Sequence, residues 1–185
     1  MLGPQGAGKG TQAKRISAEY GIPHVSTGDM FRALDESTEL GRRVKQIMDK
    51  GDLVPDDVTV AMIEERLGQP DAEGGFVLDG FPRNIAQAEA LDAMLGAIGR
   101  NLDAILFFDV SDSVGMERAL SRADIEGRTD DTPDAIAKRL AVYHEQTEPI
   151  VEYYRTTGKL VPLHAGGSID EVWAEISEAL SVMAR

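Results

Sequence analysis

The sequence contains no cysteine among its 185 residues. Disulfide bonds, thiolate nucleophiles and cysteine-ligated zinc sites are therefore excluded. The chain also lacks an excess of basic residues, because 32 Asp and Glu outnumber 19 Lys and Arg and give a net charge of -13. Such a strongly acidic chain argues against a nucleic-acid backbone as the main partner.

Long apolar runs are missing as well. No segment approaches the ~20 consecutive apolar residues that a membrane-spanning helix needs, and no signal-peptide pattern is visible. We therefore expect a cytoplasmic protein with no membrane partner, and take a monomer as the default state. The hydrophobic fraction of 42% is ordinary for a globular protein, and the length suits one domain with its own core.

The strongest motif lies in the first eleven residues. The segment from Gly3 to Thr11 reads GPQGAGKGT, and a helical pattern follows it. Glycines let a backbone turn and approach phosphate closely, while a helix N-terminus offers free N–H groups and partial positive charge. Lys9 would reach the outer phosphates and the Thr11 hydroxyl would reach magnesium. The spacing predicts a variant P-loop, with Gly10 between the lysine and the threonine.

Only Met1 and Leu2 precede this loop, whereas a P-loop normally follows about four or five apolar residues of a buried strand. We expect from this either an internal start or a truncated chain. The missing residues would forfeit about 1.5–3 kcal/mol for each large apolar side chain. The prediction is a marginally stable chain in which the N-terminal end of the loop is untethered.

Strand and helix patterns alternate along the chain, which predicts an α/β fold with a parallel sheet covered by helices on both sides. A polar loop is expected over residues 123–132 and one long helix from Ile136 to Tyr154. Ligands of such sheets bind beyond the carboxyl ends of the strands. The expected strands lie at residues 22–25, 76–79, 102–110 and 159–163.

Five motifs occur in an order that resembles a known family. They are residues 3–11, 26–32 (STGDMFR), 51–55 (GDLVP), 79–83 (DGFPR) and 127–131 (GRTDD). Over essentially its whole length the chain resembles nucleoside monophosphate kinases, most closely adenylate kinases of the short-lid type. The resemblance implies a P-loop NTPase three-layer sandwich, with a central parallel sheet flanked by helices. It also suggests a cis peptide before Pro82.

The resemblance further implies one kinase domain over residues 1–185. Its core would comprise residues 1–25, 52–121 and 133–185, its NMP-binding insertion about 26–55, and its short lid about 122–132. Arginines suit phosphate oxygens because their planar fork can bind two at once. A short lid without cysteines carries no structural zinc. The three histidines, His24, His144 and His164, have no ligand-like spacing and are interpreted as structural or exposed.

By resemblance, each site residue takes a role. The catalytic residues are Lys9, Arg83, Arg128 and Arg139. The ATP site contains Gly6, Ala7, Gly8, Lys9, Gly10, Thr11 and Arg122, with Arg122 stacking on adenine. The AMP site contains Thr27, Arg32, Leu53, Val54, Gly80, Arg83, Gln87, Arg128 and Arg139. Mg²⁺, the expected cofactor, is assigned to Thr11 and Asp79, through water or together with the nucleotide phosphates.

The implied reaction converts Mg·ATP and AMP into two ADP, so ATP, AMP and ADP are the expected partners. Asn84 after Arg83 is similar to the UMP/CMP kinase branch, which is one alternative. Thr27 and Gln87 favour AMP instead. The other alternative is a non-catalytic P-loop protein that binds nucleotide, which the short N-terminal strand leaves open.

Overall fold

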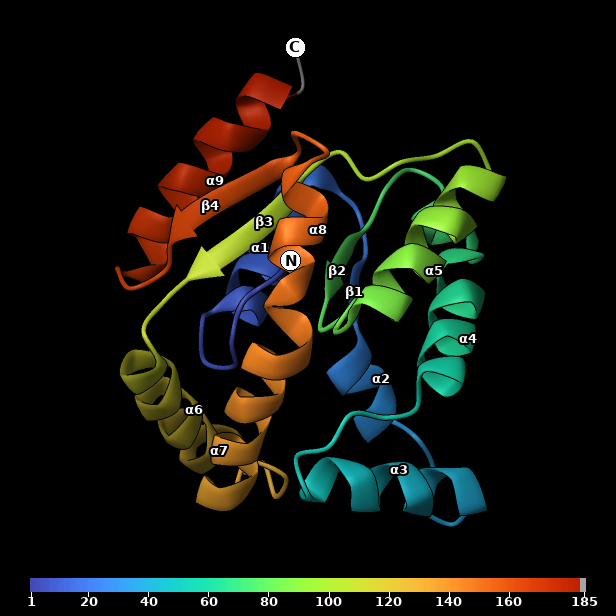
Figure 1. Ribbon diagram of the computed structural model, residues 1–185, viewed down its shortest axis with the longest axis vertical. Helices are drawn as coiled ribbons and strands as arrows, with labels where there is room; N and C mark the ends of the chain where they lie inside the picture. The colour runs from blue at the N-terminus through green and yellow to red at the C-terminus, as the bar shows by residue number, and fades with distance from the viewer. Residues whose placement is uncertain (184–185) are drawn as a thin grey trace.

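The computed structural model describes residues 1–183 (Figure 1). Within that range, helices and short strands alternate along the chain. The strands are β1 (His24–Ser26), β2 (Val77–Asp79), β3 (Ile105–Asp109) and β4 (Leu160–His164). The helices are α1 (Lys9–Tyr20), α2 (Thr27–Arg32), α3 (Glu39–Asp49), α4 (Asp56–Leu67), α5 (Ile85–Ala97), α6 (Asp112–Glu126), α7 (Pro133–Val142), α8 (Pro149–Arg155) and α9 (Ile169–Met183).

The strands form two parallel pairs, β1 with β2 and β3 with β4, which confirms the prediction of parallel pairing. Leu2 joins the pairs, because its N–H donates to the Leu106 carbonyl and its carbonyl accepts from Phe108, both at 2.8 Å. On the other side, the Met1 amino group donates to the Leu78 carbonyl at 2.9 Å. The expectation of an untethered loop start is therefore wrong for this structure.

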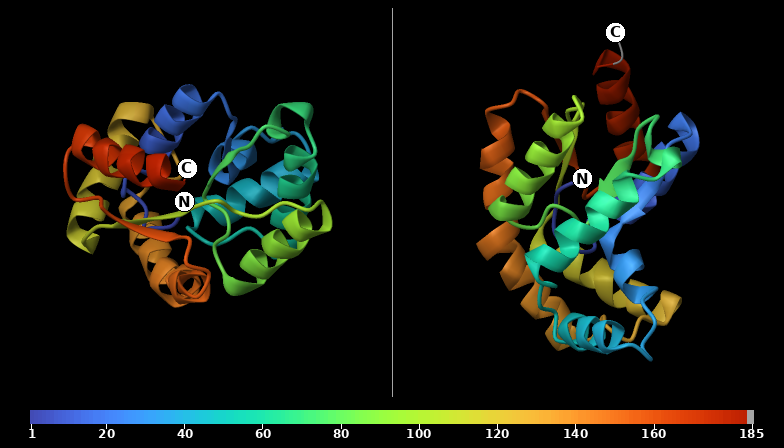
Figure 2. Two further views of the ribbon diagram at one scale, coloured as in Figure 1. Left: turned by 90° about the horizontal axis from the view of Figure 1, so that it is seen from above. Right: turned by 90° about the vertical axis from the view of Figure 1, so that its right-hand side faces the viewer.

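Helices cover both faces of the strands, and alternate side chains explain why. Leu106 and Phe108 of β3 are buried in one cluster with residues of α1 and α9. Ile105 points to the opposite face, where it packs in a cluster with Leu2 and residues of α5 and α8. The left view of Figure 2 shows α1 and α9 on one side of the strands and α5 and α8 on the other.

Two predicted boundaries differ from the structure. Helix α6 continues to Glu126, so residues 123–126 are helical where a loop was expected; Gly127 then ends the helix with a positive φ of 63°. The polar residues of this last turn resemble a loop in composition, yet they include good helix formers. The long helix expected after Ile136 is also divided, because a π-helical segment, Tyr143–Thr147, lies between α7 and α8.

The π-helical segment is linked to α6 by His144. Its Nδ1 lies 2.9 Å from Glu148 Oε2, and its Nε2 lies 3.1 Å from Asp112 at the start of α6. The hydrogen bond to Glu148, followed by the one to Asp112, raises the pKa of His144 above its usual value. Folding therefore favours the protonated ring, and the added stability is present below about pH 6.5.

We expect His144→Gln to lower the melting temperature more at pH 5.5 than at pH 8.5, because the stabilisation is lost as pH rises through the raised pKa. The pair is exposed, so the extra loss is about 1–3 °C. Thermal unfolding by circular dichroism at both pH values measures it. His164→Gln is the control, since His164 is almost fully exposed and lies 3.4 Å from Glu175. Equal losses at both pH values would contradict the prediction.

Candidate active site

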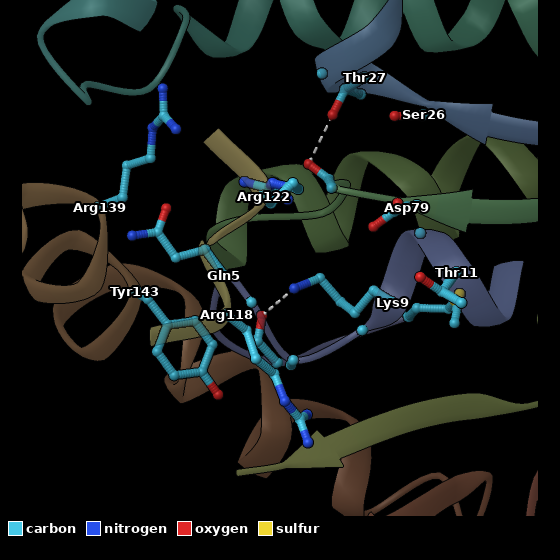
Figure 3. Close-up of a pocket in the computed structure, with 18 of the residues that line it drawn as sticks. Gln5, Lys9, Thr11, Ser26, Thr27, Asp79, Arg118, Arg122, Arg139 and Tyr143 are labelled. Carbon is cyan, nitrogen blue, oxygen red and sulfur yellow. Dashed lines mark hydrogen bonds between the residues drawn. The ribbon is translucent and has the colours of Figure 1, made fainter. Parts of the chain in front are cut away.

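A cavity of about 940 Å³ lies where the P-loop, α2, the loop after β2, α6 and α7 meet. Figure 3 shows Lys9, Thr27, Asp79 and Arg139 in one close-up of it. Every site residue predicted from the sequence lines this cavity. They are Gly6, Ala7, Gly8, Lys9, Gly10, Thr11, Thr27, Arg32, Leu53, Val54, Asp79, Gly80, Arg83, Gln87, Arg122, Arg128 and Arg139.

The P-loop has the backbone that phosphate binding requires. Gly6 has a positive φ of 74°, and a Cβ there would lie 2.0 Å from the Gly115 carbonyl of α6, so no larger residue fits. Helix α1 begins at Lys9, and no side chain caps its free N–H groups. A negatively charged ligand is therefore the natural partner of this helix end.

Lys9 points back over the loop. Its Nζ donates to the carbonyls of Gly3 at 2.7 Å and Pro4 at 2.6 Å (Figure 3 draws one contact of this amino group). Burial lowers the pKa of Lys9 to about 8, against the opposing charge of Asp79. A buried cation that is paired only with neutral carbonyls gains from a phosphate group in the cavity.

Asp79 ends β2 and faces the same part of the cavity as Thr11 (Figure 3). Burial raises the pKa of Asp79, but the His24 ring, whose Nε2 lies 3.4 Å from Asp79 Oδ2, and the charge of Lys9 outweigh it, and the pKa falls to about 2. The carboxylate is therefore ionised at neutral pH. An ionised carboxylate and a hydroxyl are the hard oxygen donors that Mg²⁺ prefers, and one carboxylate leaves positions for phosphate oxygens and water. These residues fit the predicted cofactor.

The opposite side of the cavity is formed by α2 and the loop after β2. Thr27 donates to the carbonyl of Gly80 at 2.9 Å, and Nε of Arg83 donates to the same carbonyl at 2.8 Å. The peptide between Phe81 and Pro82 is cis, as the resemblance suggested. Gly80 has a positive φ of 81°, and a Cβ there would lie 2.7 Å from the Thr27 hydroxyl. This turn thus requires glycine to hold Thr27 and Arg83 together.

Carboxylates hold the remaining arginines at the mouth of the cavity. The fully buried side chain of Asp131 accepts from Arg122 at 2.6 Å and also binds Arg139. Arg139 reaches Asp130 at 2.9 Å as well. Arg128 pairs with Glu126 at 2.6 Å within the predicted lid. These cations are therefore concentrated around one space and are each held by an acidic side chain.

Arg118 is a cavity residue that the sequence analysis missed. Its guanidinium donates to the carbonyls of Ala165 at 2.7 Å and of Gly166 and Gly167 at 3.0 Å. Arg118 precedes Arg122 by four residues on α6, so the two lie on one helix face. That i, i+4 spacing was the signal that could have found it. Arg122 shares Asp131 with Arg139, so its guanidinium lies beside that of Arg139, whereas Arg118 binds the carbonyls of residues 165–167.

Two further findings concern residues 1–183 only. No helix in this range combines the length and the apolar character needed to cross a bilayer. The same residues contain no cluster of three or more His, Asp or Glu side chains arranged to hold a metal ion.

Comparison with known proteins decides the family. A family model described as adenylate kinase matches residues 1–159. The chain belongs to the adenylate kinase family. The adenylate kinase of Xanthomonas euvesicatoria pv. vesicatoria (strain 85-10) is 50% identical to it over 181 residues, which cover 97% of each chain. That of Stenotrophomonas maltophilia (strain K279a) is 49% identical with the same coverage.

Membership of the adenylate kinase family confirms the enzyme predicted from the sequence, a phosphotransferase acting on ATP and AMP. The alternatives, a UMP/CMP kinase and a non-catalytic P-loop protein, are not favoured by these relatives. The family also confirms the P-loop NTPase type of α/β fold.

Proposed function

We propose that the cavity binds Mg·ATP along the P-loop and AMP on the side of Thr27 and Gln87, and that it transfers the terminal phosphoryl group directly between them. The observation that carries this proposal is the convergence of Lys9 and six arginines on one cavity, five of which we assign to the phosphate groups. Phosphoryl transfer needs positioning and charge neutralisation more than covalent help from the protein. The five arginines are Arg32, Arg83, Arg122, Arg128 and Arg139.

In the proposed reaction an AMP phosphate oxygen forms a bond to the γ-phosphorus of ATP, while the bond to the bridging oxygen breaks and ADP leaves. Lys9 and the arginines stabilise the charge that builds up on the transferring group. Mg²⁺, with Thr11 and Asp79 among its ligands directly or through water, would neutralise part of the phosphate charge when bound. The carboxylates that hold the arginines keep them oriented until phosphate oxygens take over some of their donors.

The finer organisation is part of the same proposal. Residues 26–55 form the NMP-binding insertion and residues 122–132 the short lid of a three-layer sandwich. Closure of both segments over the nucleotides would exclude water, which otherwise accepts the phosphoryl group. One chain supplies both nucleotide sites, so the proposal needs only a monomer. We also propose that Arg122 joins the phosphate-binding arginines and that Arg118 lines the adenine end of the ATP site.

Acceptor selectivity tests the proposed AMP site. We expect kcat/KM for AMP to exceed that for CMP and UMP by more than about tenfold at saturating Mg·ATP. A pyrimidine is smaller than adenine, so it leaves apolar contacts with Leu53 and Val54 unmade, and such losses cost about 10–200-fold. A coupled assay of ADP formation with each monophosphate measures the ratio. A pyrimidine nucleotide within tenfold of AMP would refute AMP selectivity.

A further inference from the structure

Asp56 lies behind the AMP side of the cavity and binds two amide side chains. It is the first residue of α4, and its Oδ1 accepts from Nε2 of Gln87 at 2.7 Å and from Nδ2 of Asn84 at 2.9 Å. Gln87 lines the cavity, whereas Asp56 and Asn84 are not among its lining residues. Asp56 therefore reaches the cavity through a side chain that lines it, Gln87.

The amide of Gln87 is fixed at both ends. Its Oε1 accepts the backbone N–H of Arg83 at 2.8 Å, while its Nε2 donates to Asp56. The side chain is 2% exposed, so water does not replace these partners. A reversed amide would place its oxygen against the carboxylate and its NH₂ against the N–H of Arg83. Each buried polar group left unpaired in this way costs about 1–3 kcal/mol.

A fixed amide presents one defined pattern to a base. After its two internal hydrogen bonds, Gln87 retains one N–H on Nε2 and one lone pair on Oε1. These match the N1 acceptor and the 6-amino donor of adenine. Hypoxanthine, the base of IMP, has nearly the same shape but presents an N1 donor and a 6-keto acceptor. The amide orientation that pairs with adenine would bring the N–H of Gln87 against the N1–H of hypoxanthine, and its Oε1 against the 6-keto oxygen.

We propose that Asp56 is a positioning residue for acceptor selectivity: its carboxylate fixes the Gln87 amide so that the site takes 6-amino and rejects 6-keto purine monophosphates. The inference rests on the proposed AMP site at Gln87. The carboxylate suits this role because it can only accept hydrogen bonds, so it tolerates only the NH₂ end of the glutamine.

Asp56→Asn tests the proposal with almost no change of shape. The new amide can donate or accept, so it removes the penalty for a reversed Gln87 at the Asp56 end, while the N–H of Arg83 still favours the original orientation at the other end. We expect the ratio of kcat/KM for AMP to that for IMP to fall by about tenfold or more, while KM for ATP changes less than about twofold. Asp56→Ser, whose hydroxyl also donates and accepts, should lower the ratio in the same direction and serves if the first variant does not fold.

Asp57→Asn is the matched control. Asp57 is exposed in the same first turn of α4, so this change removes an equal charge from the same helix end. A loss of stability through the helix dipole should appear in both asparagine variants, but the AMP-to-IMP ratio should stay within about twofold of wild type in the control.

Gln87→Ala separates failure of this inference from failure of the proposed site. A wild-type ratio in Gln87→Ala would show that Gln87 does not contact the base, and the proposed AMP site would be wrong. A lowered ratio in Gln87→Ala with a wild-type ratio in both Asp56 variants would overturn only the role of Asp56. A lowered ratio in the Gln87 and Asp56 variants, with the control unchanged, would support both proposals.

Discussion

Replacing Lys9 by methionine is expected to lower kcat at least about 10²-fold while the melting temperature changes little. The Nζ of Lys9 lies in the cavity and donates to the carbonyls of Gly3 and Pro4. Removing one preorganised donor from a transition-state site costs about 10²–10³ in kcat. The stability change is small because two opposing effects meet: the hydrogen bonds are lost, but an unfavourably buried cation is removed as well.

The assay for this variant compares kcat at saturating Mg·ATP and AMP with thermal unfolding by circular dichroism. Lys45→Met is the control, since Lys45 makes only exposed ion pairs, with Glu36 at 3.9 Å and Asp49 at 3.6 Å. It should keep at least about half of the wild-type kcat, since exposed pairs contribute little. A Lys9 variant that retains more than about a third of the wild-type turnover would remove Lys9 from the mechanism.

The P-loop was predictable because its backbone conformation demands particular residues. Gly6 is in tight contact with the Gly115 carbonyl, and helix α1 begins directly at Lys9. Local rules also explain the end of that helix, where Gly21 takes a positive φ of 64°. Such features depend on a few adjacent residues, so the sequence displays them without knowledge of the fold.

The pairing of strands through Leu2 was not predictable in the same way. Two residues are too short to show a strand pattern, and their hydrogen bonds reach Leu78, Leu106 and Phe108, which are distant in the chain. The π-helical segment was missed for another reason. Its apolar residues, such as Tyr143, keep a spacing that also suits a continuous α-helix, so periodicity cannot reveal the change in hydrogen bonding.

The resemblance to a family brought together residues that lie far apart in sequence, and the cavity contains all of them. It did not reveal how the protein holds them. No motif in the sequence includes Asp56, yet its carboxylate binds Gln87, 31 residues away. Asp130 and Asp131 likewise appear in the sequence only as the end of a motif, yet their side chains bind the arginines Arg122 and Arg139. Contacts of this kind depend on tertiary packing.

Arg139→Met is expected to reduce both catalysis and stability, unlike the Lys9 variant. Arg139 binds Asp130 and Asp131, whose side chains are 9% and 0% exposed, and it donates to the Met48 carbonyl at 3.0 Å. Removing one partner of a buried ion pair costs about 3–5 kcal/mol. Arg122 still holds Asp131 in the variant, so we expect about 3 kcal/mol, or a melting temperature lower by about 6–12 °C.

Lys138→Met is the matched control for this last prediction, because Lys138 is the neighbouring residue on α7 and pairs with Asp52 at 2.6 Å while both remain exposed. Its melting temperature should fall by less than about 3 °C. In the Arg139 variant kcat should fall by about 10²-fold or more, because the proposed clamp on the transferring phosphate is lost. If Arg139→Met and Lys138→Met have the same melting temperature, Arg139 does not stabilise the buried carboxylates of Asp130 and Asp131. If kcat of Arg139→Met stays above about a third of the wild-type value, Arg139 takes no part in the transfer.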